Sequence, residues 1–138
     1  MARLITTLTI GALAALALSG CAGASAPTFT KDATDDTPIT ISLSAIDIDE
    51  NALASGDVTV LGDDANAMEV LDWFFEEKGL AFEQDNGLIS TIGDLAGDQN
   101  QGWLIYVNDT MAEVGAEELI PADGDLIELR YVDYASAF

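Results

Sequence analysis

The sequence predicts an α+β fold of the β-grasp kind, with about five mostly antiparallel strands and one crossing helix. Alternation of apolar and polar residues over Ile39–Ala45 and over Leu126–Tyr134 predicts strands that are half buried. Apolar residues at helical spacing between Met68 and Phe75 predict the amphipathic helix. A chain of 138 residues is expected to form a single domain of this kind.

A hairpin is expected at the beginning of the domain. The alternating pattern that starts at Ile39 extends to about Asp47, and Val58–Leu61 is predicted to be a shorter second strand. Between them, Ser55–Asp57 has the small and polar composition of a turn. We expect the two strands to pair antiparallel.

The helix follows this hairpin. It is predicted to begin at Asp63 or Asp64, because an Asp side chain accepts hydrogen bonds from the first N–H groups of a helix. Gly79 is expected to end it, with Lys78 in the last turn. Trp73 lies off the apolar stripe and is expected at the sheet edge or partly exposed. The stripe itself consists of Met68, Leu71 and Phe74 or Phe75.

Turns and strands alternate in the C-terminal half. Turns are predicted where Asn, Asp, Gly and Pro cluster, at Asp85–Gly87, Asn108–Asp109 and Pro121–Asp125. Strands are predicted at Leu88–Ile92, Trp103–Val107 and Leu126–Tyr134. Trp103–Val107 is apolar on both faces, which favours a central position in the sheet. The connections between them are expected to be a polar loop at Gly93–Gln101 and a short helical turn or irregular segment at Ala116–Ile120.

The first residues have the composition of a bacterial lipoprotein export signal. Arg3 precedes the apolar run Leu4–Leu18, which is too short for a transmembrane helix. The run ends in Leu18-Ser19-Gly20-Cys21, where small residues precede a Cys that would be lipidated and become the new N-terminus. The alternative is an ordinary secretory signal that is cleaved near Ala22-Gly23-Ala24.

This interpretation divides the chain into three parts. Residues 1–20 are the expected signal peptide, residues 21–38 are the lipidated Cys21 and a flexible tether, and residues 39–138 are the folded domain. The expected location is the extracytoplasmic face of the cell membrane, held by the lipid on Cys21, because several acyl chains at one site suffice for stable attachment.

Charge and composition exclude several classes of function. The chain has 25 Asp and Glu against 4 Lys and Arg, a formal charge of −21, so it would repel nucleic acids. It has no His, which excludes His-based catalytic triads and His-ligated metals. We therefore expect a non-catalytic protein with no catalytic residues and no nucleic-acid partner. The acidity itself is compatible with solubility, with salt adaptation or with a basic partner.

The acidic segment Asp47–Asn51 does not match a calcium-binding loop. Acids stand at the first and third positions, but Ala52 occupies the sixth position, which requires Gly, and Val58 occupies the twelfth, which requires Glu. The sequence therefore predicts a solvated acidic turn here and no metal site.

The order and spacing of several motifs resemble the transcobalamin-like C-terminal domain, a β-grasp-like domain of unknown function found on bacterial surface proteins. The resemblance extends from about Val58 to Tyr134. It is carried by Val70-Leu71 in the helix, Gly87–Ile92, Gly102-Trp103 with Tyr106–Asn108, Gly115-Ala116, and Asp123–Ile127 with Tyr131.

This resemblance implies a ligand and a set of residues that contact it. In the cobalamin carriers of the family, the small domain closes over one face of the corrinoid. The matching positions make six residues candidates for ligand binding: Gly87, Leu88, Ile89, Trp103, Leu104 and Tyr106. A Gly allows a ligand to approach the backbone closely, and an aromatic ring suits a flat macrocycle. Each of the six could also serve only the turn, the strand or the core.

Two hypotheses follow for the function. The first is a lipid-anchored extracytoplasmic binding module, which holds a cobalamin-like or other small ligand beside Trp103 and is completed by a partner. The alternative is a cell-surface protein–protein interaction or structural module without a small-molecule ligand. A concave apolar groove beside Gly87 and Trp103 would favour the first hypothesis, and a filled core with Trp103 buried would favour the second.

Overall fold

The computed structural model describes residues 26–31 and 37–138. The expected signal peptide and Cys21 therefore lie outside the described residues. The described part contains β1 Thr28–Thr30, β2 Ile39–Ile46, β3 Ala52–Leu61, α1 Ala67–Glu77, β4 Phe82–Asp85, β5 Leu88–Ile92, β6 Leu95–Ala96, β7 Gln101–Val107, β8 Thr110–Met111, β9 Leu126–Asp133 and α2 Tyr134–Ala137.

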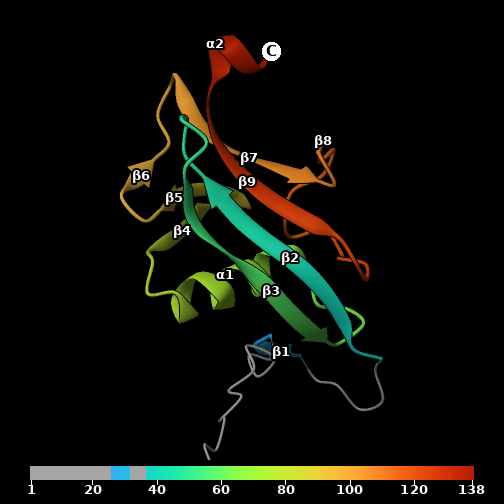
Figure 1. Ribbon diagram of the computed structural model, residues 1–138. Coiled ribbons are helices and arrows are strands. Elements are labelled where there is room, and N and C mark those ends of the chain that lie inside the picture. Colours follow the sequence, from blue (N-terminus) through green and yellow to red (C-terminus); the bar gives the residue numbers. More distant parts are fainter. Residues whose placement is uncertain (1–25, 32–36) are drawn as a thin grey trace, which may run out of the picture.

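The strands form two sheets (Figure 1). The larger sheet has six strands in the order β1-β3-β2-β9-β7-β8, and the smaller has three in the order β4-β5-β6. The larger sheet is mixed, because β1 pairs parallel with β3 and β2 pairs parallel with β9, while its other pairs are antiparallel.

The predicted fold class is therefore wrong. The described part of the chain is mostly β, with a six-stranded mixed sheet, a separate three-stranded sheet and two short helices, and it is not an α+β β-grasp domain of about five strands. The prediction missed β1, β4, β6 and β8. All four are two to four residues long, too short for a period of two to show in the sequence.

The first hairpin forms as predicted, but its turn lies elsewhere. β2 pairs antiparallel with β3, and Ser55–Asp57 lies inside β3. The chain reverses at Asp47, whose Oδ1 accepts hydrogen bonds from the backbone N–H groups of Asp49 (2.9 Å) and Asn51 (2.8 Å). The hydrogen bond from the Asn51 backbone is the main cause of the lowered pKa of Asp47. The carboxylate of Asp47 thus serves as a cap for the turn, in keeping with the predicted acidic turn.

Helix α1 begins later than predicted. Its N-cap is Asn66, whose side chain accepts from the Glu69 N–H at 2.9 Å, while the Glu69 carboxylate accepts from the Asn66 N–H at 3.2 Å. This reciprocal pair is a capping box, which Asp63 and Asp64 cannot form with a residue three positions ahead. The end is as predicted, with Gly79 at φ +69 after the last turn.

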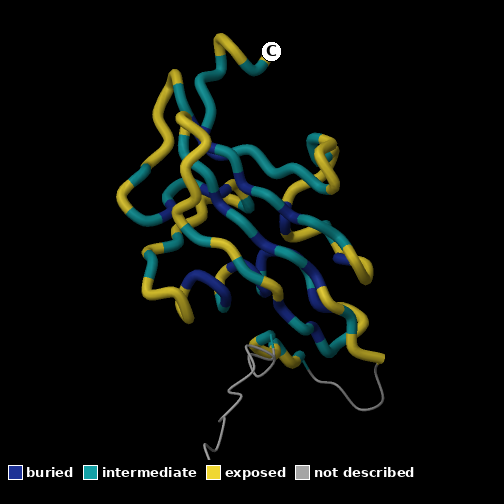
Figure 2. Tube along the Cα trace, viewed as in Figure 1, coloured by how far each residue is buried: buried dark blue, intermediate teal, exposed yellow. Residues whose placement is uncertain are grey.

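One hydrophobic core lies between α1 and the large sheet (Figure 2). Phe75 extends this core to the small sheet, because its ring stacks on Phe82 of β4 with centroids 5.2 Å apart. The core residues of α1 are Ala67, Met68, Val70, Leu71, Phe74 and Phe75, and those of the large sheet include Ile41, Leu43, Val58, Val60, Ile127 and Leu129.

Strand β1 lies in the segment that the sequence predicts to be a tether. Thr28–Thr30 pairs with Thr59–Leu61 of β3, and the Phe29 ring packs edge-on against Trp73 with centroids 5.8 Å apart. Lys31 then forms an ion pair with Glu69 of α1 at 2.8 Å. An isolated Phe among small polar residues does not show an alternating pattern, so the sequence does not reveal that this segment docks. Within the described ranges no helix is long and apolar enough to span a bilayer.

Candidate ligand-binding site

The candidate site is built around the turn between β4 and β5. Asp85 pairs with Leu88, which leaves Asn86 and Gly87 as a two-residue loop. Both have positive φ, +52 and +79, as a type I′ hairpin turn requires. The predicted Asp85–Gly87 turn is therefore present, and it projects Leu88 at the end of a short hairpin.

A pocket of about 240 Å³ lies beside this turn. Five of the six candidate residues line it: Gly87 from the turn, Leu88 and Ile89 from β5, and Trp103 and Leu104 from β7. β5 and β7 lie in different sheets. Its walls are mostly apolar, as is usual for small-molecule sites. The lining residues are Gly87, Leu88, Ile89, Trp103, Leu104, Ile105, Met111, Ala112, Val114 and Gly115.

Trp103 forms a rigid wall of the pocket. Its side chain is 7% exposed, its Nε1 donates to the Leu95 carbonyl oxygen at 3.0 Å, and its ring centroid lies 5.1 Å from that of Tyr131. Because the indole N–H is already bonded, Trp103 offers a ligand its ring rather than a hydrogen bond. Trp103 is buried and it also borders an apolar pocket, so the two features that were expected to exclude each other, a buried Trp103 and a groove beside it, occur together.

Tyr131 supports this wall from behind. Its hydroxyl donates to the Ala96 carbonyl oxygen at 2.8 Å. Burial, followed by the nearby charge of Asp98, raises the pKa of Tyr131, so the phenol stays neutral and keeps donating.

Two large apolar side chains stand exposed at the rim. Leu88 is 71% exposed and Val114 is 41% exposed. Exposed aliphatic side chains beside an apolar pocket are typical of a surface that binds a partner or ligand.

The pocket-lining residues Val114 and Gly115 continue into Ala116–Leu119, and this segment is held by the N-terminus of α1. The Met68 and Ala67 N–H groups donate to the carbonyl oxygens of Ala116 (3.0 Å) and Leu119 (2.7 Å). These bonds use donors that a helix N-terminus leaves unpaired, and they fix an otherwise irregular segment. A Cβ on Gly115 would lie 3.6 Å from the Gly87 carbonyl oxygen, so the two backbones pass close together.

Glu117 is a polar group at this site that the sequence analysis missed. A Cβ on Gly87 would lie 3.1 Å from Glu117 Oε2, so the carboxylate sits against the turn. Glu117 is exposed and can accept hydrogen bonds from a ligand. Nothing in the sequence distinguishes it from the many other acids of the chain.

Tyr106, the sixth candidate residue, lies on the other face of the sheet. It is three residues from Trp103 in the same strand, and side chains of odd separation point to opposite faces. The Leu104 side chain shares the face of Tyr106 by the same alternation, so Leu104 borders the pocket beside Trp103 from within the strand and not with its side chain on the Trp103 face. On its own face Tyr106 borders a larger cavity of about 730 Å³, together with Ile46, Ile48, Glu128, Arg130 and Val132 among others. The candidate set is thus divided between two faces.

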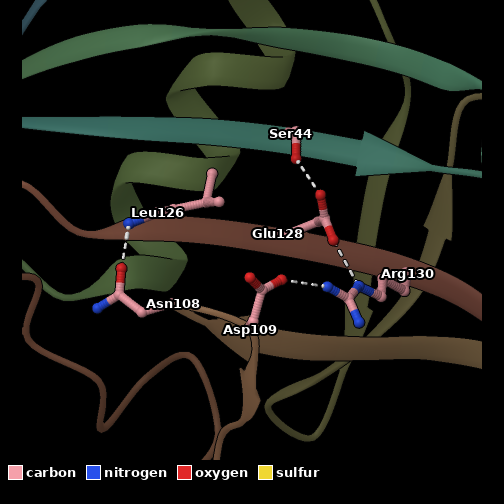
Figure 3. A network of polar contacts seen from close by, with 6 residues as sticks. All are labelled: Ser44, Asn108, Asp109, Leu126, Glu128 and Arg130. Atoms are coloured by element: carbon pink, nitrogen blue, oxygen red, sulfur yellow. Dashed lines mark hydrogen bonds and ion pairs between the residues drawn. The ribbon is translucent and has the colours of Figure 1, made fainter.

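A polar network covers this second face (Figure 3). Arg130 forms ion pairs with Asp109 at 2.9 Å and with Glu128, which also accepts from Ser44 Oγ at 3.2 Å. Its guanidinium lies 4.0 Å from the centroid of the Tyr106 ring. Partial burial acts to lower the pKa of Arg130, but the hydrogen bond and charge of Glu128 outweigh it and raise that pKa. The network is internally paired and holds Tyr106 in place.

Residues 26–31 and 37–138 contain no group of three or more His, Cys, Asp and Glu side chains placed to hold a metal ion.

Residues 64–133 match the family described as a domain of unknown function, DUF4430. The chain belongs to this family. No curated protein matches the chain.

Two solved structures share the fold of this DUF4430 chain. One is a protein from Ruminococcus gnavus ATCC 29149 described as a candidate metal-binding protein, with 21% identity, a TM-score of 0.51, and coverage of 69% of this chain and 97% of that one. The other is haptocorrin in complex with Cbi, with 17% identity, a TM-score of 0.58 and coverage of 73% of this chain. The match spans 26% of haptocorrin, about a quarter of its length. Together these two likenesses show the fold that this chain shares with both proteins.

Proposed function

We propose that this DUF4430 chain is a non-catalytic binding module that holds one face of a flat small molecule, a corrinoid being the first candidate. The observation that carries the proposal is the convergence of Gly87, Leu88, Ile89, Trp103 and Leu104 on one apolar pocket. Likeness in fold to haptocorrin, which was solved with Cbi, supports a ligand of this class.

The size of the pocket sets the mode of binding. At about 240 Å³ it is smaller than the roughly 300–1,000 Å³ of pockets that enclose a drug-sized ligand. It can cover one face of a corrinoid or one of its side groups, and Glu117 at the turn can accept a hydrogen bond from an amide. A partner protein would cover the other face, so this chain alone is expected to bind with micromolar affinity.

We further propose that the module is held at the extracytoplasmic face of the membrane by lipid on Cys21. The sequence Leu18-Ser19-Gly20-Cys21 after an apolar run supports this proposal. A lipid-anchored module would keep its ligand close to the membrane surface.

The test is a titration of Cbi and of cobalamin into the chain from Ala22 onward, which contains every described element. The chain has two Trp residues, and Trp73→Phe leaves Trp103 as the only Trp, whose emission can be excited selectively at wavelengths that Tyr does not absorb. Quenching of Trp103 at micromolar ligand is expected. Absence of quenching and of calorimetric heat at ten times that concentration would contradict the proposal.

A matched pair of variants locates the site. Leu88→Ser removes an exposed side chain from the rim and should weaken binding about tenfold, the equivalent of about 1.4 kcal/mol. Ile120→Ser is the control, because Ile120 is 52% exposed and does not line the pocket. Equal effects of both variants would indicate non-specific adsorption.

A further inference from the structure

The border of the large sheet offers a strand edge that the proposed function does not use. β1 pairs with β3 only at Thr59–Leu61, which leaves Ala52–Val58 without a neighbour on that side within residues 26–31 and 37–138 (Figure 1). Ala52, Leu53, Ser55 and Asp57 are exposed along it.

The direction of the backbone groups follows from the bonds at either side. The Thr59 N–H donates to the Pro27 carbonyl oxygen and the Leu61 carbonyl oxygen accepts from the Lys31 N–H, so the odd-numbered residues of β3 direct these groups outward. On the other side, the Ser42 N–H donates to the Asp125 carbonyl oxygen, away from its β3 partner Asp57. The N–H and C=O groups of Ser55 and Asp57 therefore point away from the sheet.

A hollow lies beside this edge on the side of α1. A cavity of about 370 Å³ is lined by Leu53, Gly79, Leu80, Ala81, Gly93 and Asp94. A Cβ on Gly56 would lie 3.6 Å from both Lys78 Nζ and the Phe74 ring, so the end of α1 borders the edge too. A strand added here would direct alternate side chains toward this apolar wall and toward Asp57 on the opposite face.

Within the described residues, this edge has few of the features that block strand addition. It contains no Pro or Lys, and Ala52, Ala54, Ser55 and Gly56 are small, although it carries one charge at Asp57 and a bulge at Leu53, where the register with β2 shifts. The same side of β3 already pairs with another strand, because β1 lies along the C-terminal residues Thr59–Leu61 of β3.

Charge decides which strand fits. Two copies of a chain with a formal charge of −21 repel each other, which disfavours pairing of β3 with β3. We propose that the Ala52–Val58 edge of β3 is a docking site for an extended, basic segment of another protein, which adds to the sheet as a strand. Its basic side chains lie on the face of Asp57, and its apolar side chains lie on the face of the Leu53–Leu80 hollow.

The first test uses a capped synthetic peptide of eight alternating Lys and Val residues with the chain from Ala22 onward. Amide hydrogen exchange of Ser55 and Asp57 is expected to slow at least about tenfold on saturation, while the even-numbered Ala54 and Gly56, which face β2, change little. A peptide of alternating Lys and Pro is the control, because it has the same charge but cannot form a ladder. Equal binding of both peptides, or no added protection at Ser55 and Asp57, would overturn the proposal.

Variants of the edge give the second test. Ser55→Pro removes one outward N–H without removing a ladder bond to β2, and it should weaken the Lys-Val peptide about tenfold. Unchanged amide exchange at Ala54 and Gly56 would show that the Ser55→Pro variant is folded. A second variant, Asp57→Asn, removes the negative charge of that side chain without changing the backbone, and weaker binding of the Lys-Val peptide is expected. Ser55→Thr is the matched control and should bind as the parent does. A parent chain that forms dimers without peptide, with Ser55 and Asp57 protected in the dimer, would show that the occupant is a second copy and would overturn the proposal.

Discussion

The indole nitrogen of Trp103 donates a hydrogen bond to the carbonyl oxygen of Leu95 at 3.0 Å. This bond joins β7 of the large sheet to β6 of the small one, and it holds the ring that forms one wall of the candidate pocket. The pocket therefore exists because two sheets are fixed relative to each other at this point.

Trp103→Phe should lower the free energy of unfolding by about 1–3 kcal/mol, because it removes the hydrogen bond and leaves a smaller ring in a packed site. Chemical denaturation measures this change. Trp73→Phe is the control, since Trp73 is only partly buried, and it should cost less than about 1 kcal/mol. If the two variants are equally stable, the Trp103 bond does not join the sheets as described.

Gly87→Ala and Gly124→Ala should reduce stability by similar amounts, about 1 kcal/mol each, because both positions have positive φ, +79 and +84. A Cβ on Gly124 meets nothing within 4 Å, whereas one on Gly87 meets the Glu117 carboxylate, which is exposed and can move. Only Gly87→Ala should weaken Cbi binding. Equal binding by both variants would place the ligand elsewhere.

Glu69→Gln tests the ion pair that holds β1 to α1. The hydrogen bond from Lys31 is the main cause of the lowered pKa of Glu69, relative to a usual value of 4.5. A carboxyl whose pKa falls on folding stabilises the protein above its unfolded pKa, and that contribution disappears as the pH falls through the folded pKa.

The difference in unfolding free energy between the parent and Glu69→Gln should therefore be below about 1 kcal/mol at pH 7, since the pair is partly exposed. It should approach zero below the folded pKa of Glu69, as measured by urea denaturation from pH 7 to pH 2.5. A difference that does not change with pH would show that the charge of Glu69 has no part in it.

Cys21→Ser tests the proposed anchor in the full chain expressed in a bacterium. The parent should sediment with membranes and carry acyl groups on the peptide that begins at Cys21, as detected by mass spectrometry. The variant should lack the acyl groups and leave the membrane fraction. A parent cleaved near Ala22-Gly23-Ala24 and released into solution would support the ordinary secretory signal instead.

Prediction from the sequence worked where local chemistry determines the structure. The Asp85–Gly87 turn follows from the tolerance of Asn and Gly for positive φ, and it placed Leu88 and Ile89 correctly on β5. Ser55–Asp57 has the same turn-like composition, yet it lies within β3, because the Asp47 side chain caps a competing turn and the ladder with β2 continues past Gly56. Composition alone does not show which of two such segments forms the turn.

The parts that failed depend on contacts distant in sequence. Strand β1 forms because Phe29 packs on Trp73, and the loop beside the pocket is held because Met68 bonds to Ala116. The resemblance brought Trp103 and Tyr106 together as one site, although the pleat of β7 places them on opposite faces. No local sequence pattern distinguishes Glu117, beside the pocket, from the other acidic residues of the chain.

The most direct test of the central claim is methyl and indole NMR of the chain from Ala22 onward during addition of Cbi. We predict that the Trp103 indole and the methyl groups of Leu88, Ile89 and Val114 shift together, while Ile120 does not. Shifts confined to Ile46, Ile48 and Val132 would place the ligand in the cavity beside Tyr106, and they would contradict the proposal that the pocket beside Trp103 is the binding site.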